Sequence, residues 1–168
     1  MRLSAPQLCR CALMASLIAL CSQLMIPLPP IPFNLALFAV YLSGLVLGRH
    51  LGVAAVAAYL FMGFCGLPIF AGFQGGPGAL LGPTGGFLIG YLPCAWFAGH
   101  FKKTPVKAMV AGLITCCALG TLHYMLLTQT PLWTALTVCV FPFLLGDGIK
   151  IFLAAIIAPR LKKAVGSF

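Results

Sequence analysis

The sequence predicts an all-α integral membrane protein with six transmembrane helices, and three observations support this fold class. Of the 168 residues, 62% are hydrophobic and only 7% are charged, whereas soluble domains carry about 25% charged residues. Apolar stretches of roughly 20 residues, enough to cross the hydrocarbon layer as a helix, recur along the chain. The basic residues stand in short clusters between these stretches. We therefore expect one multi-pass domain over residues 1–168, located in the cell (plasma) membrane.

The predicted spans follow the apolar stretches in chain order. We place them at about 10–26, 32–48, 51–70, 84–100, 106–128 and 141–160. Arg2 and Arg10 before the first stretch resemble the start of a signal peptide. Because no small-x-small cleavage site precedes the prolines that follow, we expect a retained first helix.

The outer end of the last span is not marked by hydropathy alone, because the stretch from Leu132 to Ala158 is almost continuously apolar. Counting back about 20 residues from Arg160 places that end near Phe141 and Pro142, and proline is tolerated in a first helical turn. Residues 132–140, which include Trp133, are then predicted to form a short helix or hairpin at the outer interface, where tryptophan is favoured.

The placement of basic residues predicts the orientation. The connections after the first, third and fifth spans contain no Lys, Arg, Asp or Glu. Basic residues in the terminal segments and the other connections are Arg2, Arg10, Arg49, Lys102, Lys103, Lys107, Arg160, Lys162 and Lys163. The positive-inside rule then places both termini in the cytoplasm. The same placement argues that the net charge of +9 reflects topology and not nucleic-acid binding.

The sequence offers no convincing catalytic, metal or cofactor site. All eight cysteines lie in or beside apolar segments, where a thiol behaves as a small hydrophobe, and their spacings do not match zinc or redox motifs. His50 and His100 fall at predicted cytoplasmic ends, and His123 is interpreted as a hydrogen-bonded histidine inside the bundle. We therefore expect no enzyme activity, no metal and no cofactor. Without an ATP-binding motif, any ATP-driven transport requires other subunits to hydrolyse the nucleotide.

A glycine-rich connection, "GFQGGPGALLGPTGG", covers residues 72–86 and contains seven glycines. It lacks the Gly-Lys-Ser/Thr ending of a phosphate-binding loop, and no G-x-G-x-x-G pattern fits it. We interpret it either as backbone that approaches a small ligand, with Thr84 capping the next helix, or as a flexible connection.

The one acidic residue of the chain, Asp147, lies inside the last predicted span with Lys150 three residues later. Residues i and i+3 share a helix face, and Asp147 is predicted about 9 Å inside the outer boundary at about 1.5 Å per residue. Intramembrane charges cost about 2.5–3.5 kcal/mol each at the membrane centre and are functional by default. Three uses remain open: a packing salt bridge, a relay with His123, or a polar clamp for a ligand that carries N–H and C=O groups.

Three segments of the chain together show a family pattern: "IPLPPIPFNLALFAVYLSGLVLGRHLG" (26–52), "GLPIFAGFQGGPGALLGPTGGFLIGY" (66–91) and "FPFLLGDGIKIFLAA" (141–155). They resemble the BioY family, the biotin-specific substrate-binding (S) components of energy-coupling-factor (ECF) transporters. The resemblance implies a high-affinity biotin site that opens to the outside. It places Asp147 on the ureido N–H groups and Lys150 either on the ureido oxygen or on the valerate carboxylate. The other implied site residues are Phe33, Asn34, Phe73, Gln74, Thr84, Gly85 and Gly86.

The resemblance also implies partners. S components dock to a transmembrane coupling subunit through small residues of the first helix, here Ala12, Ala15, Ser16 and Ala19, which suit close helix packing. Two cytoplasmic ATPases would complete the transporter, unless the chain works as a solitary homo-oligomer in the lipid membrane. Two alternatives remain: an S component or secondary transporter for another small heterocycle, and a membrane assembly protein that binds no ligand.

Overall fold

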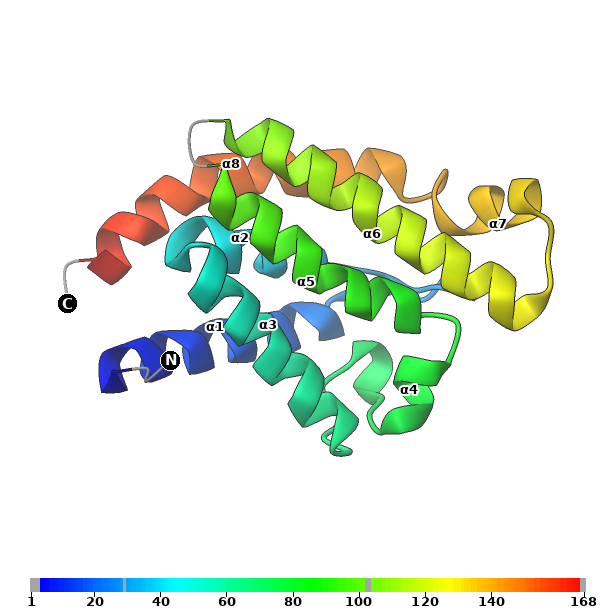
Figure 1. Cartoon of the computed structure of the whole chain (residues 1–168), viewed down its shortest axis with the longest axis horizontal. Coiled ribbons are helices and arrows are strands. Elements are labelled where there is room, and N and C mark those ends of the chain that lie inside the picture. The colour runs from blue at the N-terminus through cyan, green and yellow to red at the C-terminus, as the bar shows by residue number, and fades with distance from the viewer. Residues whose placement is uncertain (1–3, 29, 102–103, 167–168) are drawn as a thin grey trace.

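The computed structural model describes residues 4–28, 30–101 and 104–166, and these are largely helical (Figure 1). In chain order the elements are α1 Ala5–Gln23, β1 Met25–Ile26, β2 Phe33–Asn34, α2 Ala36–Leu47, α3 Arg49–Phe64, the 3-10 turn η1 Ala71–Phe73, α4 Pro77–Leu81, α5 Gly85–His100, α6 Pro105–Thr128, α7 Leu132–Cys139 and α8 Leu144–Gly166. A helix therefore lies in each of the six predicted ranges, and α7 matches the short helix expected before the last one.

Local sequence features explain where several helices begin and end. Proline stands in the first turn of α1, α4 and α6, where its missing N–H costs no helical hydrogen bond. Gly48 alone separates α2 from α3, with a φ of 81° that side chains other than glycine rarely adopt. The first helix starts earlier than expected, at Ala5, and α3 ends at Phe64 instead of 70.

Helix α5 packs against α2, α3 and α6. These contacts are made by small residues. A Cβ on Gly44 of α2 would collide with the Ala95 carbonyl of α5, and one on Gly90 of α5 would lie 2.8 Å from the Cys116 sulfur of α6. Small residues let helix backbones approach closely. Helix α8 covers α2, and α1 covers α2 and α3.

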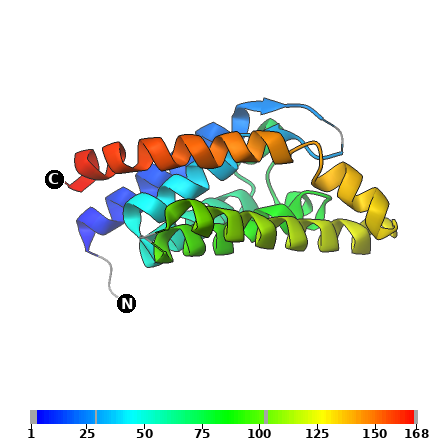
Figure 2. The same cartoon turned by 90° about the horizontal axis from the view of Figure 1, so that it is seen from above.

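The two ends of the elongated bundle differ in character. One end, which we call the terminal end, contains the start of α1, the end of α8, the α2–α3 junction, the end of α5 and the start of α6 (Figures 1 and 2). The β1–β2 hairpin, α4 and α7 lie towards the other end, which we call the loop end. Arg49 and His100 meet at the terminal end, with 3.1 Å between Nη1 and Nδ1. Arg2, Lys102 and Lys103 of the predicted topology pattern lie outside the described residues.

The outside of the described bundle is apolar, as a lipid-facing surface requires. Large exposed side chains include Leu13, Phe61, Ile114, Leu145 and Phe152, and Trp133 on α7 is 74% exposed. Helices α1 and α6 are long and apolar enough to cross a membrane, and α7 with α8, bent by 48°, forms a third candidate if the pair is one span. Helices α2 and α3 are shorter apolar helices.

Candidate ligand-binding site

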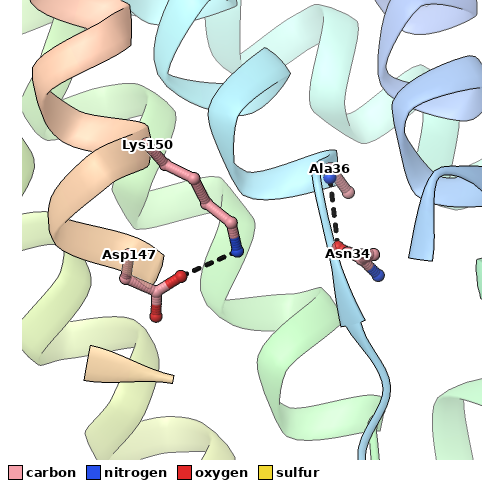
Figure 3. A network of polar contacts seen from close by, with 4 residues as sticks. All are labelled: Asn34, Ala36, Asp147 and Lys150. Atoms are coloured by element: carbon pink, nitrogen blue, oxygen red, sulfur yellow. Dashed lines mark hydrogen bonds and ion pairs between the residues drawn. The ribbon is translucent and has the colours of Figure 1, made fainter. Parts of the chain in front are cut away.

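Asp147 and Lys150 form a buried ion pair on the first turns of α8 (Figure 3). Lys150 Nζ donates to Asp147 Oδ1 over 2.8 Å, and the two residues are only 4% and 7% exposed, respectively. The i, i+3 spacing that predicted a shared helix face thus produces direct contact. A pair with this burial carries a large desolvation cost, so it is weak evidence for stability.

Two stacked aromatic rings lie beside this pair. Lys150 Nζ lies 3.9 Å from the centroid of the Phe33 ring, a cation–π contact. Phe33 stacks on Phe143 with 6.0 Å between ring centroids, and it packs so tightly on α8 that a Cβ at Gly146 would collide with its ring. The glycine before Asp147 therefore lets the Phe33 ring reach Lys150.

The hydrogen-bonding capacity of the pair is only partly used. Among the described residues, Lys150 is the one side chain that bonds the Asp147 carboxylate, and Lys150 donates to Asp147 alone. A carboxylate accepts several hydrogen bonds, and an ammonium group has three donors. The pair can therefore accept N–H groups and donate to a carbonyl or carboxylate at the same time. A salt bridge that serves only packing would normally have these positions satisfied within the protein.

Two adjoining cavities provide the space for a ligand. The larger, which we call the main cavity, has a volume of about 480 Å³, within the range of about 300–1,000 Å³ for small-molecule sites. The smaller, the side cavity, has about 60 Å³ and contains Asp147 and Lys150 in its wall. Both are lined by Ile31, Pro32, Asn34, Phe87 and Tyr91. The charged pair therefore lies beside a cavity large enough for a small metabolite.

Asn34 connects the start of α2 to this site (Figure 3). Its Oδ1 accepts the Ala36 N–H over 3.1 Å, as residues near a helix start commonly do. The amide nitrogen keeps two donors, and the residue lines both cavities. Asn34 thus combines a structural hydrogen bond with donors available to a ligand.

Only some residues of the glycine-rich connection line the cavities. Gly82, Pro83 and Thr84 line the main cavity, and the Gly82 carbonyl is fixed by His123 Nε2 of α6 over 3.0 Å. His123 is therefore hydrogen-bonded within the bundle, in agreement with the prediction. Gly85 and Gly86 line neither cavity; they pack against the Leu80 carbonyl and against α6. Their role in this structure is close packing at the start of α5.

Two expectations need correction against the structure. Phe73 was expected beside Gln74 in the wall, but Gln74 alone lines the main cavity and Phe73 is 72% exposed. The reason is the backbone: Gly72 and Phe73 both have positive φ, 70° and 57°, and the turn carries the ring outwards. In the predicted docking face, Ala12 and Ser16 are exposed and Ala19 is half-buried, whereas Ala15 is 1% exposed and faces the core.

Several cavity-lining residues were missed from the sequence. Tyr59, Phe70, Phe87 and Tyr91 line the main cavity, and Cys116, Cys117 and Cys139 line the side cavity. The spacing of Phe87 and Tyr91, one helical turn apart directly after the glycine-rich connection, could have identified them. The cysteines carried no such pattern. Among the described residues, no group of three or more His, Cys, Asp or Glu side chains is placed to hold a metal ion.

Comparison with known proteins gives a consistent result. The sequence profile of the BioY family matches residues 1–167. The chain is 39% identical over 163 residues to the biotin transporter BioY of Thermotoga maritima, covering 94% of this chain and 96% of that protein. It is 36% identical over 154 residues to a probable biotin transporter BioY of Pyrococcus horikoshii, covering 90% and 93%. The crystal structure of the S component for biotin from an ECF-type ABC transporter superposes with a TM-score of 0.86 at 29% identity, covering 94% of this chain and 90% of that one.

Proposed function

The chain belongs to the BioY family, and from that premise we propose that it captures biotin from the outer side of the membrane and passes it inwards as the S component of an ECF transporter. The observation that carries this proposal is the buried Asp147–Lys150 pair, incompletely satisfied and adjacent to the main cavity. The relatives named above are transporters, so the chain is a transport component and not an enzyme.

The chemistry of biotin matches this site. Its ureido ring carries two N–H donors and one carbonyl acceptor, and its valerate chain ends in a carboxylate. In our proposal Asp147 accepts the ureido N–H groups and Lys150 donates to the ureido oxygen, while the rest of the molecule occupies the main cavity. The alternative contact of Lys150 with the valerate carboxylate uses the same donors. Because the side cavity holds only about 60 Å³, the ureido ring displaces nearby side chains on entry.

The other groups have defined roles in this proposal. The Asn34 amide and the 82–84 backbone supply further polar contacts, and Phe33 and Gln74 form walls. Phe73 in the turn η1, and Gly85 and Gly86 at the start of α5, are also implied by the family resemblance. In this proposal they support the site through their backbones. No cofactor takes part, since biotin is the cargo.

The proposed membrane arrangement has six spans with both termini in the cytoplasm. The basic residues that lie at the terminal end support this orientation. The loop end, with the main cavity, then faces outwards, and α7 lies at the outer interface of the plasma membrane. Ala12 and Ser16, with Ala19 beside them, form the exposed small-residue face of α1 for a transmembrane coupling subunit that works with two ATPases. A solitary homo-oligomer is the alternative assembly.

Equilibrium binding of labelled biotin to the purified protein in detergent tests the proposal. The parent is expected to bind tightly, and Asp147→Asn and Lys150→Ala are each expected to lose about 100-fold or more in affinity, as when one partner of a buried charge pair is removed. Excess unlabelled biotin should compete, whereas other vitamins with ring N–H groups should not. A well-folded parent that does not bind biotin would overturn the assignment.

A further inference from the structure

A short loop over residues 69–75 closes part of the main cavity. Phe70, Ala71, Gln74 and Gly75 line this cavity. The loop is folded back on itself, because the Phe70 N–H donates to the Gln74 carbonyl over 2.9 Å. Phe73 has a φ of 57°, a left-handed conformation that is uncommon for residues other than glycine. Such a backbone conformation persists only where the surrounding structure holds it in place.

The loop is held from α1. At the last residue of this helix, the Gln23 side-chain amide donates from Nε2 to the Phe70 carbonyl over 3.0 Å, and its Oε1 accepts the Phe73 N–H over 3.0 Å. One amide thus spans both sides of the turn. The neighbouring Ser22 hydroxyl lies within hydrogen-bond distance of the Ile69 carbonyl, and Tyr59 OH donates to the same carbonyl over 3.4 Å.

The chemistry of these contacts requires a side-chain amide. A glutamine offers an acceptor oxygen and a donor nitrogen at the same distance from the backbone, which fits one carbonyl and one N–H of the loop. A leucine satisfies neither group. A glutamate accepts the Phe73 N–H but turns a second acceptor towards the Phe70 carbonyl.

Apart from the Gln23 contacts, Phe70 at the start of the loop is packed more tightly than residues 71–74. Phe70 is wedged in the core, where a Cβ at Gly63 would collide with its ring and Tyr59 meets it edge-on at 5.4 Å between centroids. Residues 71–74, by contrast, have exposed or half-buried side chains. Gln23 is therefore the side chain that fixes the outer half of the loop relative to its anchored inner half.

We propose that Gln23 is a positioning residue that latches the 69–75 loop over the main cavity and so sets how long a ligand stays bound. Ligand exit requires the loop to lift, and lifting breaks both amide hydrogen bonds. In this proposal the two amide hydrogen bonds hold the loop in the same position with and without a ligand, so their loss accelerates ligand exchange more than it weakens equilibrium affinity. The residence time of the ligand then depends on the last turn of α1, the helix that also carries the exposed small-residue face. The identity of the ligand rests on the proposed function.

The test combines two measurements on Gln23→Leu, Gln23→Glu and a control, Gln7→Leu. Gln7 is the other glutamine of α1, where its amide oxygen accepts the Ser4 N–H at the opposite end of the helix. The first measurement is the dissociation rate of labelled biotin after an excess of unlabelled biotin is added. We expect this rate to rise about tenfold or more in Gln23→Leu, with a smaller change in Kd, and to be unchanged in Gln7→Leu. Gln23→Glu, which keeps the acceptor, should lie between Gln23→Leu and the parent.

The second measurement is hydrogen exchange over residues 69–75 without ligand. We expect residues 69–75 to exchange faster in Gln23→Leu than in the parent, while exchange in the preceding helix α3 stays unchanged. Unchanged exchange and an unchanged dissociation rate in the folded variant would overturn the latch. If the parent binds no biotin, the proposed function fails, and the exchange measurement alone still decides whether Gln23 holds the loop. A lower Tm with an unaltered dissociation rate would indicate a purely structural role and would also overturn the proposal.

Discussion

The Asp147–Lys150 pair and the Arg49–His50–His100 group are both clusters of charged or titratable side chains, but they lie in opposite environments. The first is buried beside a cavity near the loop end. The second is exposed at the terminal end, where Arg49 Nε donates to His50 Nε2 over 2.9 Å and Nη1 lies 3.1 Å from His100 Nδ1. Exposed charged pairs lose little solvation and contribute little to the free energy of unfolding. The membrane orientation of the chain is therefore enough to explain the second group. A buried pair has a desolvation cost, so a ligand is the better explanation for the first.

The largest expected effect comes from exchanging the two charges, Asp147→Lys with Lys150→Asp. The opposite charges stay adjacent at i, i+3, but the carboxylate and ammonium change places relative to the cavity. A ligand with a fixed donor and acceptor order then meets the wrong partners, and we expect biotin affinity to fall about 100-fold or more, with Tm little changed. Binding assays and thermal unfolding in detergent measure the two effects. If the exchanged variant keeps its affinity for biotin, the pair serves helix packing and not ligand binding.

Removing one member of the pair should separate stability from binding. Lys150→Ala leaves Asp147 buried without its partner, which costs about 3–5 kcal/mol. The double variant Asp147→Leu with Lys150→Met removes both charges and should be as stable as the parent or more so, yet unable to bind biotin. Unfolding midpoints of the two variants give the comparison. A double variant as unstable as Lys150→Ala would mean that the pair itself stabilises the fold.

Gly146 and Gly148 flank Asp147 and offer a matched pair of substitutions. A Cβ at Gly146 would collide with the Phe33 ring, whereas a Cβ at Gly148 meets nothing within 4 Å. Gly146→Ala should push Phe33 away from Lys150, costing about 1–3 kcal/mol of stability and about tenfold in biotin affinity. Gly148→Ala should leave affinity unchanged and gain about 0.5–1 kcal/mol from helix propensity. Equal effects at both positions would show that the Phe33 contact is unimportant.

The smallest effect is expected in the exposed group. Arg49→Gln removes the hydrogen bonds to both imidazoles, but the side chains are exposed, so the free energy of unfolding should change by no more than about 1 kcal/mol. Biotin affinity should remain within twofold of the parent in the same binding assay. A larger loss of affinity would mean that the terminal end is coupled to the main cavity.

The sequence was sufficient for features that depend on local pattern. Apolar stretches located a helix in each predicted range, and the count back from Arg160 separated α7 from α8. The i, i+3 spacing placed Asp147 beside Lys150. The hydrogen bond of His123, in contrast, was expected without its partner, because Gly82 lies 41 residues earlier.

What the sequence could not provide depends on contacts between distant segments. Phe33 reaches Lys150 across more than one hundred positions of the chain, and no local pattern encodes that approach. The end of α3 at Phe64 is an exception, because Gly66 and Pro68 are local signals for the end of a helix that the apolar character of residues 65–70 outweighed in the prediction. In the structure Gly66 turns the chain with a φ of 100°, and Phe70 packs on Gly63. The burial of Ala15 likewise depends on which face of α1 meets α2 and α3.

The glycine contacts of helix α5 have a mechanical consequence. Where Gly44 meets Ala95, the two helix backbones pack with almost no side chain between them, and Gly90 packs directly on the Cα and the sulfur of Cys116. These contacts leave little side-chain freedom to absorb a shift. Helices joined in this way rotate or slide only as a block, since packed interiors do not deform continuously. We therefore expect α2, α5 and α6 to move as one unit, and we expect the shape changes that admit and release a ligand to occur in the loops at the loop end.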